Sequence, residues 1–368
     1  MAHLDQPAND VLEISIFGGG TYGECIVVHL GFEKWLIIDS FKNPETKVPI
    51  AIEYLKSINV DFKKQVILVG CTHWHDDHIQ GLFAVVESCE SAKFCCSEAM
   101  NRDEFMAILI TNSKINSQKA GANEISDILK YLKPNGRAAT RAIQDRPVVI
   151  QAFPNGFKSR VVALSPSDES IANFQAKLAE ALDKREDYNT VINPINPNHS
   201  SVVFLIEVGH NRIILGGDLE KTDNNNTGWG AVINSLECPD KTVEIFKFPH
   251  HGSENGYHEE FWEKAMIPNN PIVGLTTYNK GRKFLPSDED IKRIFEKTNR
   301  LFITSSPKTS PQKKDRETKV EKILKMNKQE VNEVTFDYGH IRLRKKMEDM
   351  DVNNWNVDLF GEALSIEV

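Results

Sequence analysis

The chain alternates short apolar runs with longer segments of helical periodicity. The run at 66–70, Val-Ile-Leu-Val-Gly, is short and apolar enough to predict a buried strand. A first group of strands is predicted over 11–38, and further strands at 147–153, 160–165, 202–208, 212–217, 243–248, 271–276, 300–304 and 333–345. Helices are predicted near 47–58, 79–89, 168–185, 257–266, 286–298 and 315–327. Strands that alternate with helices in this way are typical of an α/β fold.

The segment that follows the 66–70 strand contains His73-x-His75-x-Asp77-His78, four possible metal ligands in six positions. Residues two apart on an extended chain point the same way, so His73 and His75 are expected to hold one metal together. Asp77 and His78, past the strand end, can turn toward a second metal. The alternative is a polar turn into a helix, with Asp76 or Asp77 capping the helix N-terminus.

Several other apolar runs also end in a residue that can bind metal. Asp39 follows one strand, Asp218 follows another, and the pair His250-His251 follows a third. A sheet delivers such residues to a shared rim at the strand ends. Each of them alone is more often a cap or turn residue, so only the complete set, together with the histidine motif, predicts a metal site.

In this order the residues resemble the metallo-β-lactamase superfamily, and more closely the hydrolase domain of the competence protein ComEC and its stand-alone relatives. The resemblance covers roughly residues 11–345. The segments that carry it are Gly18-Gly-Gly-Thr-Tyr-Gly-Glu24, Asn198-His-Ser-Ser-Val-Val203, Leu215-Gly-Gly-Asp-Leu-Glu220 and Lys247-Phe-Pro-His-His-Gly-Ser253. It implies an αββα four-layer sandwich, in which two mixed sheets face each other and helices cover the outside.

The resemblance also implies two divalent metal ions, with Zn²⁺ as the expected metal and Mn²⁺ or Fe as alternatives that accept the same ligands. The expected ligands are His73, His75 and either Asn198 or His199 for the first ion, Asp77, His78 and His251 for the second, and Asp218 as a bridge. His251 is preferred to His250 because His-Gly-Ser is similar to the His-x-Thr/Ser of related nucleases.

Further residues are assigned to catalysis beside these ligands. Asp77 is expected to help hold the attacking water, and Asp39 to orient a ligand imidazole or contact the edge of the metal site. His250 is a candidate proton donor to the leaving group or a phosphate contact. Ser253 and the Gly252 N–H are expected to hold substrate oxygens.

Length and composition agree with a cytoplasmic enzyme. A chain of 368 residues with 40% hydrophobic residues can bury a sizeable core. No apolar stretch is long enough to span a bilayer, and the N-terminus does not resemble a secretory signal. Six cysteines lack paired spacing, which favours reduced thiols, and Cys71 is interpreted as a core residue.

One hydrolase domain is predicted over 1–345, with a helical insertion at about 97–133. An acidic C-terminal tail is predicted over 346–368, where Trp355 and Leu359-Phe360 are candidate anchors for a protein partner.

The function predicted from these features is that of a metal-dependent hydrolase, a phosphodiesterase or nuclease acting on nucleic acid or a nucleotide. A net charge of −8 argues against broad capture of duplex DNA, although Lys308 to Lys328 and Arg342 to Lys346 offer local basic stretches. The alternatives are a small-molecule ester or lactone hydrolase, and a metal-stabilised regulatory or binding subunit of a larger complex.

Overall fold

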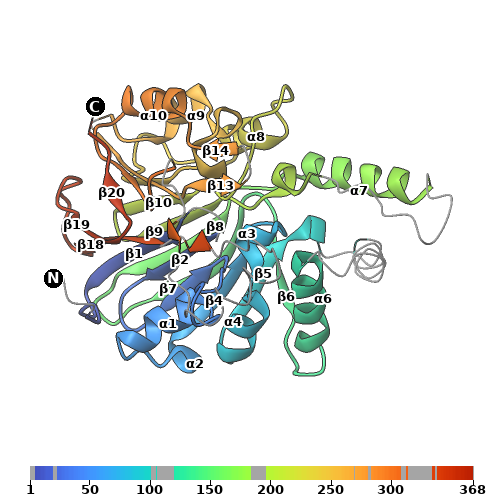
Figure 1. Cartoon of the computed structure of the whole chain (residues 1–368), viewed down its shortest axis with the longest axis horizontal. Coiled ribbons are helices and arrows are strands. Elements are labelled where there is room, and N and C mark those ends of the chain that lie inside the picture. Colours follow the sequence, from blue (N-terminus) through green and yellow to red (C-terminus); the bar gives the residue numbers. More distant parts are fainter. Residues whose placement is uncertain are drawn as a thin grey trace, which may run out of the picture.

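The computed structural model describes residues 5–19, 23–100, 105, 120–183, 196–268, 270–280, 283–307, 312–313, 334–335 and 338–367. Two eight-stranded sheets pack face to face, and helices cover their outer surfaces (Figure 1). This is the αββα sandwich expected of a metallo-β-lactamase-type fold.

The first sheet is antiparallel at one side and parallel at the other. Its strands, in spatial order, are β19 (Asn356–Gly361), β18 (Gly339–Lys346), β1 (Val11–Gly18), β2 (Glu24–His29), β3 (Trp35–Ile38), β4 (Val66–Cys71), β5 (Lys93–Ser97) and β6 (Ala139–Ala142). The pairs from β3 to β6 are parallel. The carboxyl ends of these four strands therefore meet at one edge.

The second sheet has the same mixed character. Its strands, in spatial order, are β20 (Leu364–Ser365), β15 (Leu301–Ile303), β12 (Ile272–Leu275), β11 (Ile245–Lys247), β10 (Asn211–Leu215), β9 (Phe204–Val208), β8 (Lys158–Ala163) and β7 (Arg146–Ala152). The pairs β10–β11, β11–β12 and β12–β15 are parallel. Two short ribbons lie outside the sheets: β13 (Tyr278–Lys280) with β14 (Lys283–Leu285), and β16 (Gln312–Lys313) with β17 (Val334–Thr335).

The core between the sheets forms because alternate residues of each strand face the opposite sheet. Leu12, Ile14 and Ile16 of β1 are fully buried there, in one cluster with residues of the second sheet such as Phe204 and Ile213. A strand that is buried on both faces needs apolar residues throughout, which explains the continuous apolar runs.

Helices cover the two outer faces. The first sheet is covered by α1 (Ile50–Ser57), α4 (Leu82–Ser88) and α6 (Ala120–Leu132), with α2 (Phe62–Gln65) and α3 (Asp76–Ile79) nearby. The second sheet is covered by α8 (Gly228–Asn234), α9 (Glu259–Ala265) and α10 (Asp288–Phe295). The remaining elements are α7 (Asp168–Asp183) and the 3₁₀ turns η1 (Glu98–Met100), η2 (Pro197–Ser200), η3 (His250–Gly252) and η4 (Glu254–Gly256).

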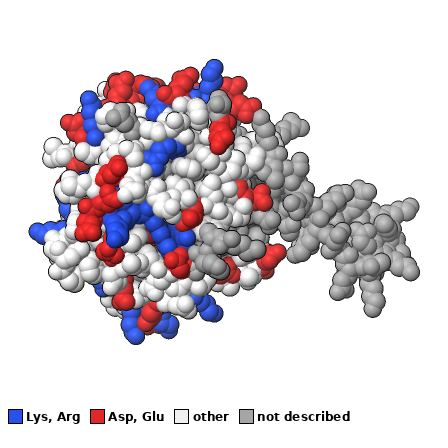
Figure 2. Space-filling view, turned by 90° about the vertical axis from the view of Figure 1, so that its left-hand side faces the viewer, with Lys and Arg blue, Asp and Glu red and all other residues white. Residues whose placement is uncertain are grey.

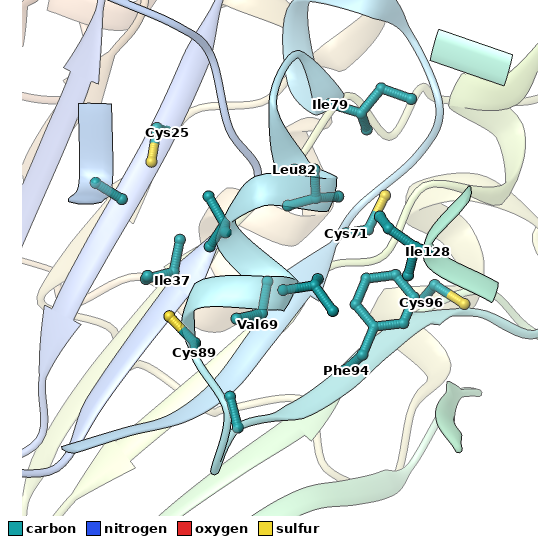
Figure 3. Close-up of a cluster of buried hydrophobic side chains, with 14 of the residues drawn as sticks. Cys25, Ile37, Val69, Cys71, Ile79, Leu82, Cys89, Phe94, Cys96 and Ile128 are labelled. Atoms are coloured by element: carbon teal, nitrogen blue, oxygen red, sulfur yellow. The ribbon is translucent and has the colours of Figure 1, made fainter. Parts of the chain in front are cut away.

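Five of the six cysteines are buried, and none of the six forms a disulfide. Cys25, Cys71, Cys89 and Cys96 lie in the apolar cluster beneath the helices of the first sheet (Figure 3). The interpretation of Cys71 as a core residue is therefore confirmed, because its thiol is fully buried among apolar side chains.

Two predicted helices differ from the structure or lie outside it. The helix predicted over 79–89 is divided, since α3 ends at Ile79 and α4 begins at Leu82 after Gly81, whose φ of +78° interrupts the helix. Of the predicted helical insertion at 97–133, β5, η1 and α6 are seen, and residues 101–104 and 106–119 lie outside the described residues. The helix predicted over 315–327 also lies outside them.

The prediction of a separate acidic tail over 346–368 is wrong. β19 pairs with β18 at the edge of the first sheet, and β20 pairs with β15 at the edge of the second. Trp355 is buried, and its indole N–H donates to the Glu244 carboxylate at 2.7 Å. The segment thus closes both sheets of its own chain, so Trp355 is unsuited to anchor a partner.

Three basic side chains of the stretch at 342–346 are engaged in ion pairs within the chain. Arg342 pairs with Asp358, Arg344 pairs with Glu13, and Lys345 pairs with Glu244 at 2.8, 2.8 and 3.0 Å. On the face in Figure 2, basic and acidic side chains are likewise interspersed. Of the second stretch, 308–328, the structure describes only 312–313.

Across the described residues, no helix combines the length and the apolar character that crossing a bilayer requires.

Candidate metal centre

The predicted ligands meet where the parallel strands of both sheets end. Asp39 follows β3 and the histidine motif follows β4, whereas Asp218 and His251 follow β10 and β11 of the facing sheet. Two glycines permit this convergence. At Gly217, with φ +52°, a Cβ would lie 2.6 Å from Ser201 Oγ, and at Gly23, with φ +125°, a Cβ would lie 2.0 Å from the Asp77 carbonyl oxygen. The close approach of Gly23 to Asp77 therefore explains why glycine is needed at this position of the 18–23 turn.

One group of possible ligands consists of His73, His75 and Asp218, whose ligand atoms all lie within 4.8 Å of one another. His73 Nε2 is 3.0 Å from His75 Nδ1 and 3.7 Å from Asp218 Oδ2. Thr72 Oγ lies 3.0 Å from His73 Nδ1, which fixes the ring and directs Nε2 into the group. These atoms can hold one metal ion.

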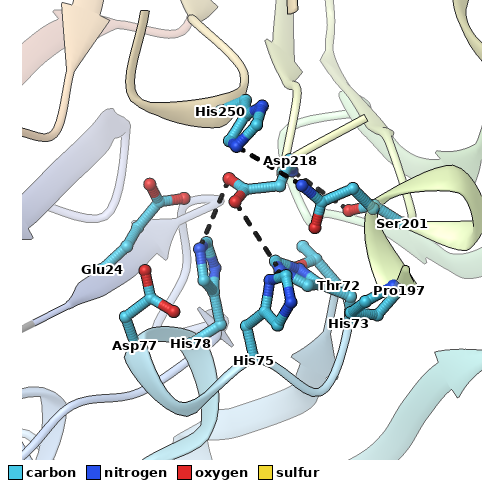
Figure 4. A network of polar contacts seen from close by, with 12 residues as sticks. Glu24, Thr72, His73, His75, Asp77, His78, Pro197, Ser201, Asp218 and His250 are labelled. Carbon is cyan, nitrogen blue, oxygen red and sulfur yellow. Dashed lines mark hydrogen bonds and ion pairs between the residues drawn. The ribbon is translucent and has the colours of Figure 1, made fainter. Parts of the chain in front are cut away.

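A second group consists of Asp77, His78 and His251. His251 Nε2 lies 3.2 Å from Asp77 Oδ2 and 3.9 Å from Asp218 Oδ2. The other oxygen of Asp218 lies 3.4 Å from His78 Nε2. Asp218 therefore faces both groups, as a bridging carboxylate must (Figure 4).

Asp39 supports His78 from behind. Its Oδ2 lies 2.8 Å from His78 Nδ1, and its carboxylate accepts the Thr72 N–H at 2.7 Å and the Thr72 hydroxyl at 2.6 Å. These contacts hold the imidazole so that Nε2 points to Asp218. The arrangement fits the predicted role of Asp39 in orienting a ligand imidazole.

Two buried atoms at the centre, His78 Nε2 and Asp218 Oδ1, lie 3.4 Å apart and have no hydrogen-bond partner among the described residues. Buried polar atoms are rarely left without a partner, so this pair fits a bound cation. Burial opposes the charged forms, but the mutual attraction of the Asp218 carboxylate and the His78 imidazole lowers the pKa of Asp218 well below its usual value and raises the pKa of His78. Burial lowers the pKa of His73, which favours the neutral imidazole that a metal binds.

The structure distinguishes His250 from its neighbour. Its Nδ1 lies 2.7 Å from Asn255 Oδ1, and its Nε2 lies 3.4 Å from Asn198 Nδ2. His250 belongs to neither ligand group, whereas His251 belongs to one. Burial lowers the pKa of His250, so the neutral ring is favoured.

The two alternatives for the third ligand of the first ion differ in their surroundings. The His199 side chain is 43% exposed, with Nε2 3.5 Å from Glu220 Oε2, and it belongs to neither group. The predicted ligand role of His199 is therefore not supported by this arrangement. Asn198 is buried, its Nδ2 donates to Glu220 Oε1 at 2.8 Å, and its Oδ1 has no partner.

The turn after β11 has a strained backbone. His250 and His251 have φ of +47° and +52°, and Asp39 has φ +59°. Residues other than glycine rarely adopt this conformation, and such strain concentrates at functional sites.

Within the turn after β11, the Gly252 N–H donates to the Pro249 carbonyl and the Ser253 N–H to the His250 carbonyl. The Gly252 N–H is therefore not available to substrate, and a role for the Ser253 hydroxyl stays a prediction.

Four residues near the centre were not singled out from the sequence. Glu24 and Lys247 form a fully buried ion pair, and Thr276 donates to Glu24 at 2.5 Å while its hydroxyl lies 3.3 Å from His251 Nδ1. Glu220 lies between His199 and His250. Glu24, Lys247 and Glu220 stand within segments that carry the resemblance, but a lone carboxylate or a lysine in a strand has no spacing that would identify it.

No family model matches the chain. Among curated proteins, ComE operon protein 3 of Bacillus subtilis is 29% identical over 140 residues, which is 37% of this chain and 17% of that protein. The chain thus matches only about a sixth of that relative's length.

Two solved structures of low sequence identity are similar in fold. The metallo-beta-lactamase fold protein YhfI of Bacillus subtilis is 11% identical, with 79% of this chain and 95% of that chain covered and a TM-score of 0.37. A protein of Thermotoga maritima described as a metallo-beta-lactamase is 10% identical, with 56% and 79% covered and a TM-score of 0.31.

Proposed function

We propose that the chain is a metal-dependent hydrolase that cleaves phosphodiesters of nucleic acid or nucleotides, with two divalent ions, Zn²⁺ in the first instance. The observation that carries the proposal is Asp218, whose two oxygens face two separate groups of ligands. When bound, two such ions lower the pKa of water and neutralise charge on phosphoryl oxygens.

The residues of the chain supply orientation and proton transfer. Asp39 fixes His78, and Thr276 lies against His251, so both imidazoles are held before substrate arrives. The Nδ1 of His250 forms a hydrogen bond with Asn255 Oδ1. The Nε2 of His250 faces Asn198 at the partly open side of the site. We infer that His250 exchanges a proton with a leaving oxygen through Nε2.

The polar character of this side favours a phosphodiester. His250, Asn198, Glu220 and His199 form a continuous polar wall, which suits a charged and strongly hydrated substrate. An ester or lactone hydrolase is the second candidate, and one observation favours it. Trp74, next to the candidate ligands His73 and His75, packs edge-on against the buried rings of Phe105 and Phe174, with ring centroids 4.8 and 5.5 Å apart, and it offers an apolar surface.

The purified protein is expected to bind close to two equivalents of a transition metal after reconstitution. The reason is that each ligand group supplies two imidazoles and a carboxylate. Elemental analysis of the dialysed protein measures this, and His251→Ala, which removes one ligand of the second group, should bind about one equivalent fewer. Less than about half an equivalent of any metal in the wild type would contradict the dinuclear proposal.

His250→Ala is expected to lower kcat about 10²- to 10⁴-fold with metal content near that of the wild type, because His250 acts on the leaving group and not on the metal. Rates are measured on single-stranded DNA and on bis-p-nitrophenyl phosphate. His210→Ala, at the exposed turn between β9 and β10, is the matched control.

The assignment is reversed if His250→Ala loses metal and His251→Ala keeps it. If the wild type cleaves lactones or carboxylic esters but no phosphodiester with any metal, the second candidate takes the place of the first.

A further inference from the structure

A separate pocket of about 200 Å³ lies beside the polar wall, between α7, η2 and the 222–227 loop. We call it the α7 pocket; it is defined by Asn173 and Lys177 of α7, Asn196 and His199 at η2, and Thr222 and Thr227 of the loop. In Figure 1, α7 begins beside the sandwich and its far end projects away from it. The volume is sufficient for a phosphate or a group of similar size, and too small for a drug-sized ligand.

The chemistry of the pocket favours an anion. The chain carries a net charge of −8, yet the described residues that line the pocket include no Asp or Glu. They include an exposed ammonium group, that of Lys177, and the imidazole of His199. Asn196 accepts the Asn198 N–H with its side-chain oxygen at 3.1 Å, so its amino group is oriented as a donor. Charge-assisted hydrogen bonds of this kind are the usual means of binding phosphate.

The pocket is joined to the metal centre through Glu220. One oxygen of Glu220 lies 3.5 Å from His199 Nε2, and the other accepts from Asn198 and lies 3.4 Å from His250 Nδ1. Burial opposes ionisation of Glu220, but its hydrogen bonds with His199 and Asn198 hold its pKa below the usual value. Glu220 is therefore bound by Asn198 and His199, which belong to the polar wall. Only one layer of side chains separates the pocket from His250.

We propose that the α7 pocket binds the phosphate next to the scissile phosphodiester in a nucleotide chain. The proposal rests on the phosphodiesterase function proposed above, and it gives His199 a role in binding substrate instead of metal. The protein then prefers substrates that carry a second phosphate, because Lys177 supplies a positive charge, and Asn196 and His199 supply hydrogen bonds, for a group that a lone phosphodiester lacks.

The test compares thymidine dinucleotide with its 5′-phosphorylated and 3′-phosphorylated forms. For one of the two phosphorylated forms, kcat/KM of the wild type should be about tenfold higher than for the unmodified dinucleotide, since one hydrogen bond to a charged group is worth about that factor. This preference should fall to about unity in Lys177→Met and in His199→Gln. Lys221→Met, which removes a lysine that pairs with Glu254 outside the pocket, should keep it.

Binding is measured separately from cleavage, by fluorescence anisotropy of the labelled dinucleotides on chelator-treated protein. The same preference is expected in Kd, with the same loss in the two pocket variants. If phosphodiesters are cleaved but neither kcat/KM nor Kd depends on the second phosphate, the pocket proposal is overturned. If phosphate-dependent binding requires Lys177 and His199 but no phosphodiester is cleaved, the pocket proposal is supported and the proposed reaction is contradicted. If neither is seen, both fail.

Discussion

Asp218→Asn is expected to lower kcat/KM on phosphodiesters at least about 10³-fold, which corresponds to about 4 kcal/mol of transition-state stabilisation. The carboxylate oxygens of Asp218 lie 3.4 Å from His78 Nε2 and 3.7 Å from His73 Nε2, so a neutral amide at this position removes the negative charge that faces both ligand sets. Steady-state kinetics and metal analysis measure the loss, and metal content should fall together with rate.

The substitution keeps the shape of the side chain, and the Asp218 N–H still donates to Ser201 Oγ at 3.1 Å. The variant should therefore stay folded, which circular dichroism and thermal unfolding verify. Asp223→Asn, the same change on an exposed loop, is the matched control and should retain wild-type activity. A folded Asp218→Asn protein with more than a tenth of the wild-type rate would refute a shared bridging carboxylate.

The strands and the candidate ligands at the centre of the site could be predicted because the relevant signals are local, whereas the αββα arrangement follows from the resemblance. An apolar run that ends in Asp39 or Asp218 predicts both a strand and the edge where its last residue lies. The spacing of His73 and His75 follows from the period of an extended chain. None of these predictions requires knowledge of which strands are neighbours.

The predictions that failed depend on long-range contacts. Residues 356–365 lie in the acidic segment that the sequence predicts to be a tail. Their strands β19 and β20 form by pairing with β18 and β15, which lie in two different sheets. From the sequence, Arg344 is interpreted as an exposed basic residue. Its ion pair with Glu13, which is far away in sequence, is seen only in the structure. His199 and Asn198 are neighbours in the chain, and the 3₁₀ turn η2, not their residue types, decides which of them is buried.

Lys247→Met is expected to lower the free energy of unfolding by about 3–5 kcal/mol, the usual cost when one partner of a buried ion pair is removed. Lys247 and Glu24 are both completely buried, and the Lys247 ammonium also lies 3.4 Å from the Gly217 carbonyl oxygen. Methionine fills a similar volume, but it leaves the Glu24 carboxylate without its cation. Among the described residues, one Glu24 oxygen already has no hydrogen-bond partner, and the other would keep only the neutral Thr276 hydroxyl.

Urea unfolding of the chelator-treated protein measures the change. Lys63→Met, the same substitution at an ion pair whose side chains are 59% and 62% exposed, should leave the unfolding midpoint unchanged. The double variant Lys247→Met with Glu24→Gln should recover most of the loss, because a buried pair that is replaced as a whole costs little.

If the free energy of unfolding of the double variant is as low as that of Lys247→Met alone, the packing of Lys247 and not its charge is what stabilises the fold. If the double variant folds well but binds less metal, the loss belongs to the contacts from Glu24 through Thr276 to His251. The buried pair would then hold the second ligand group in place as well as joining the two sheets.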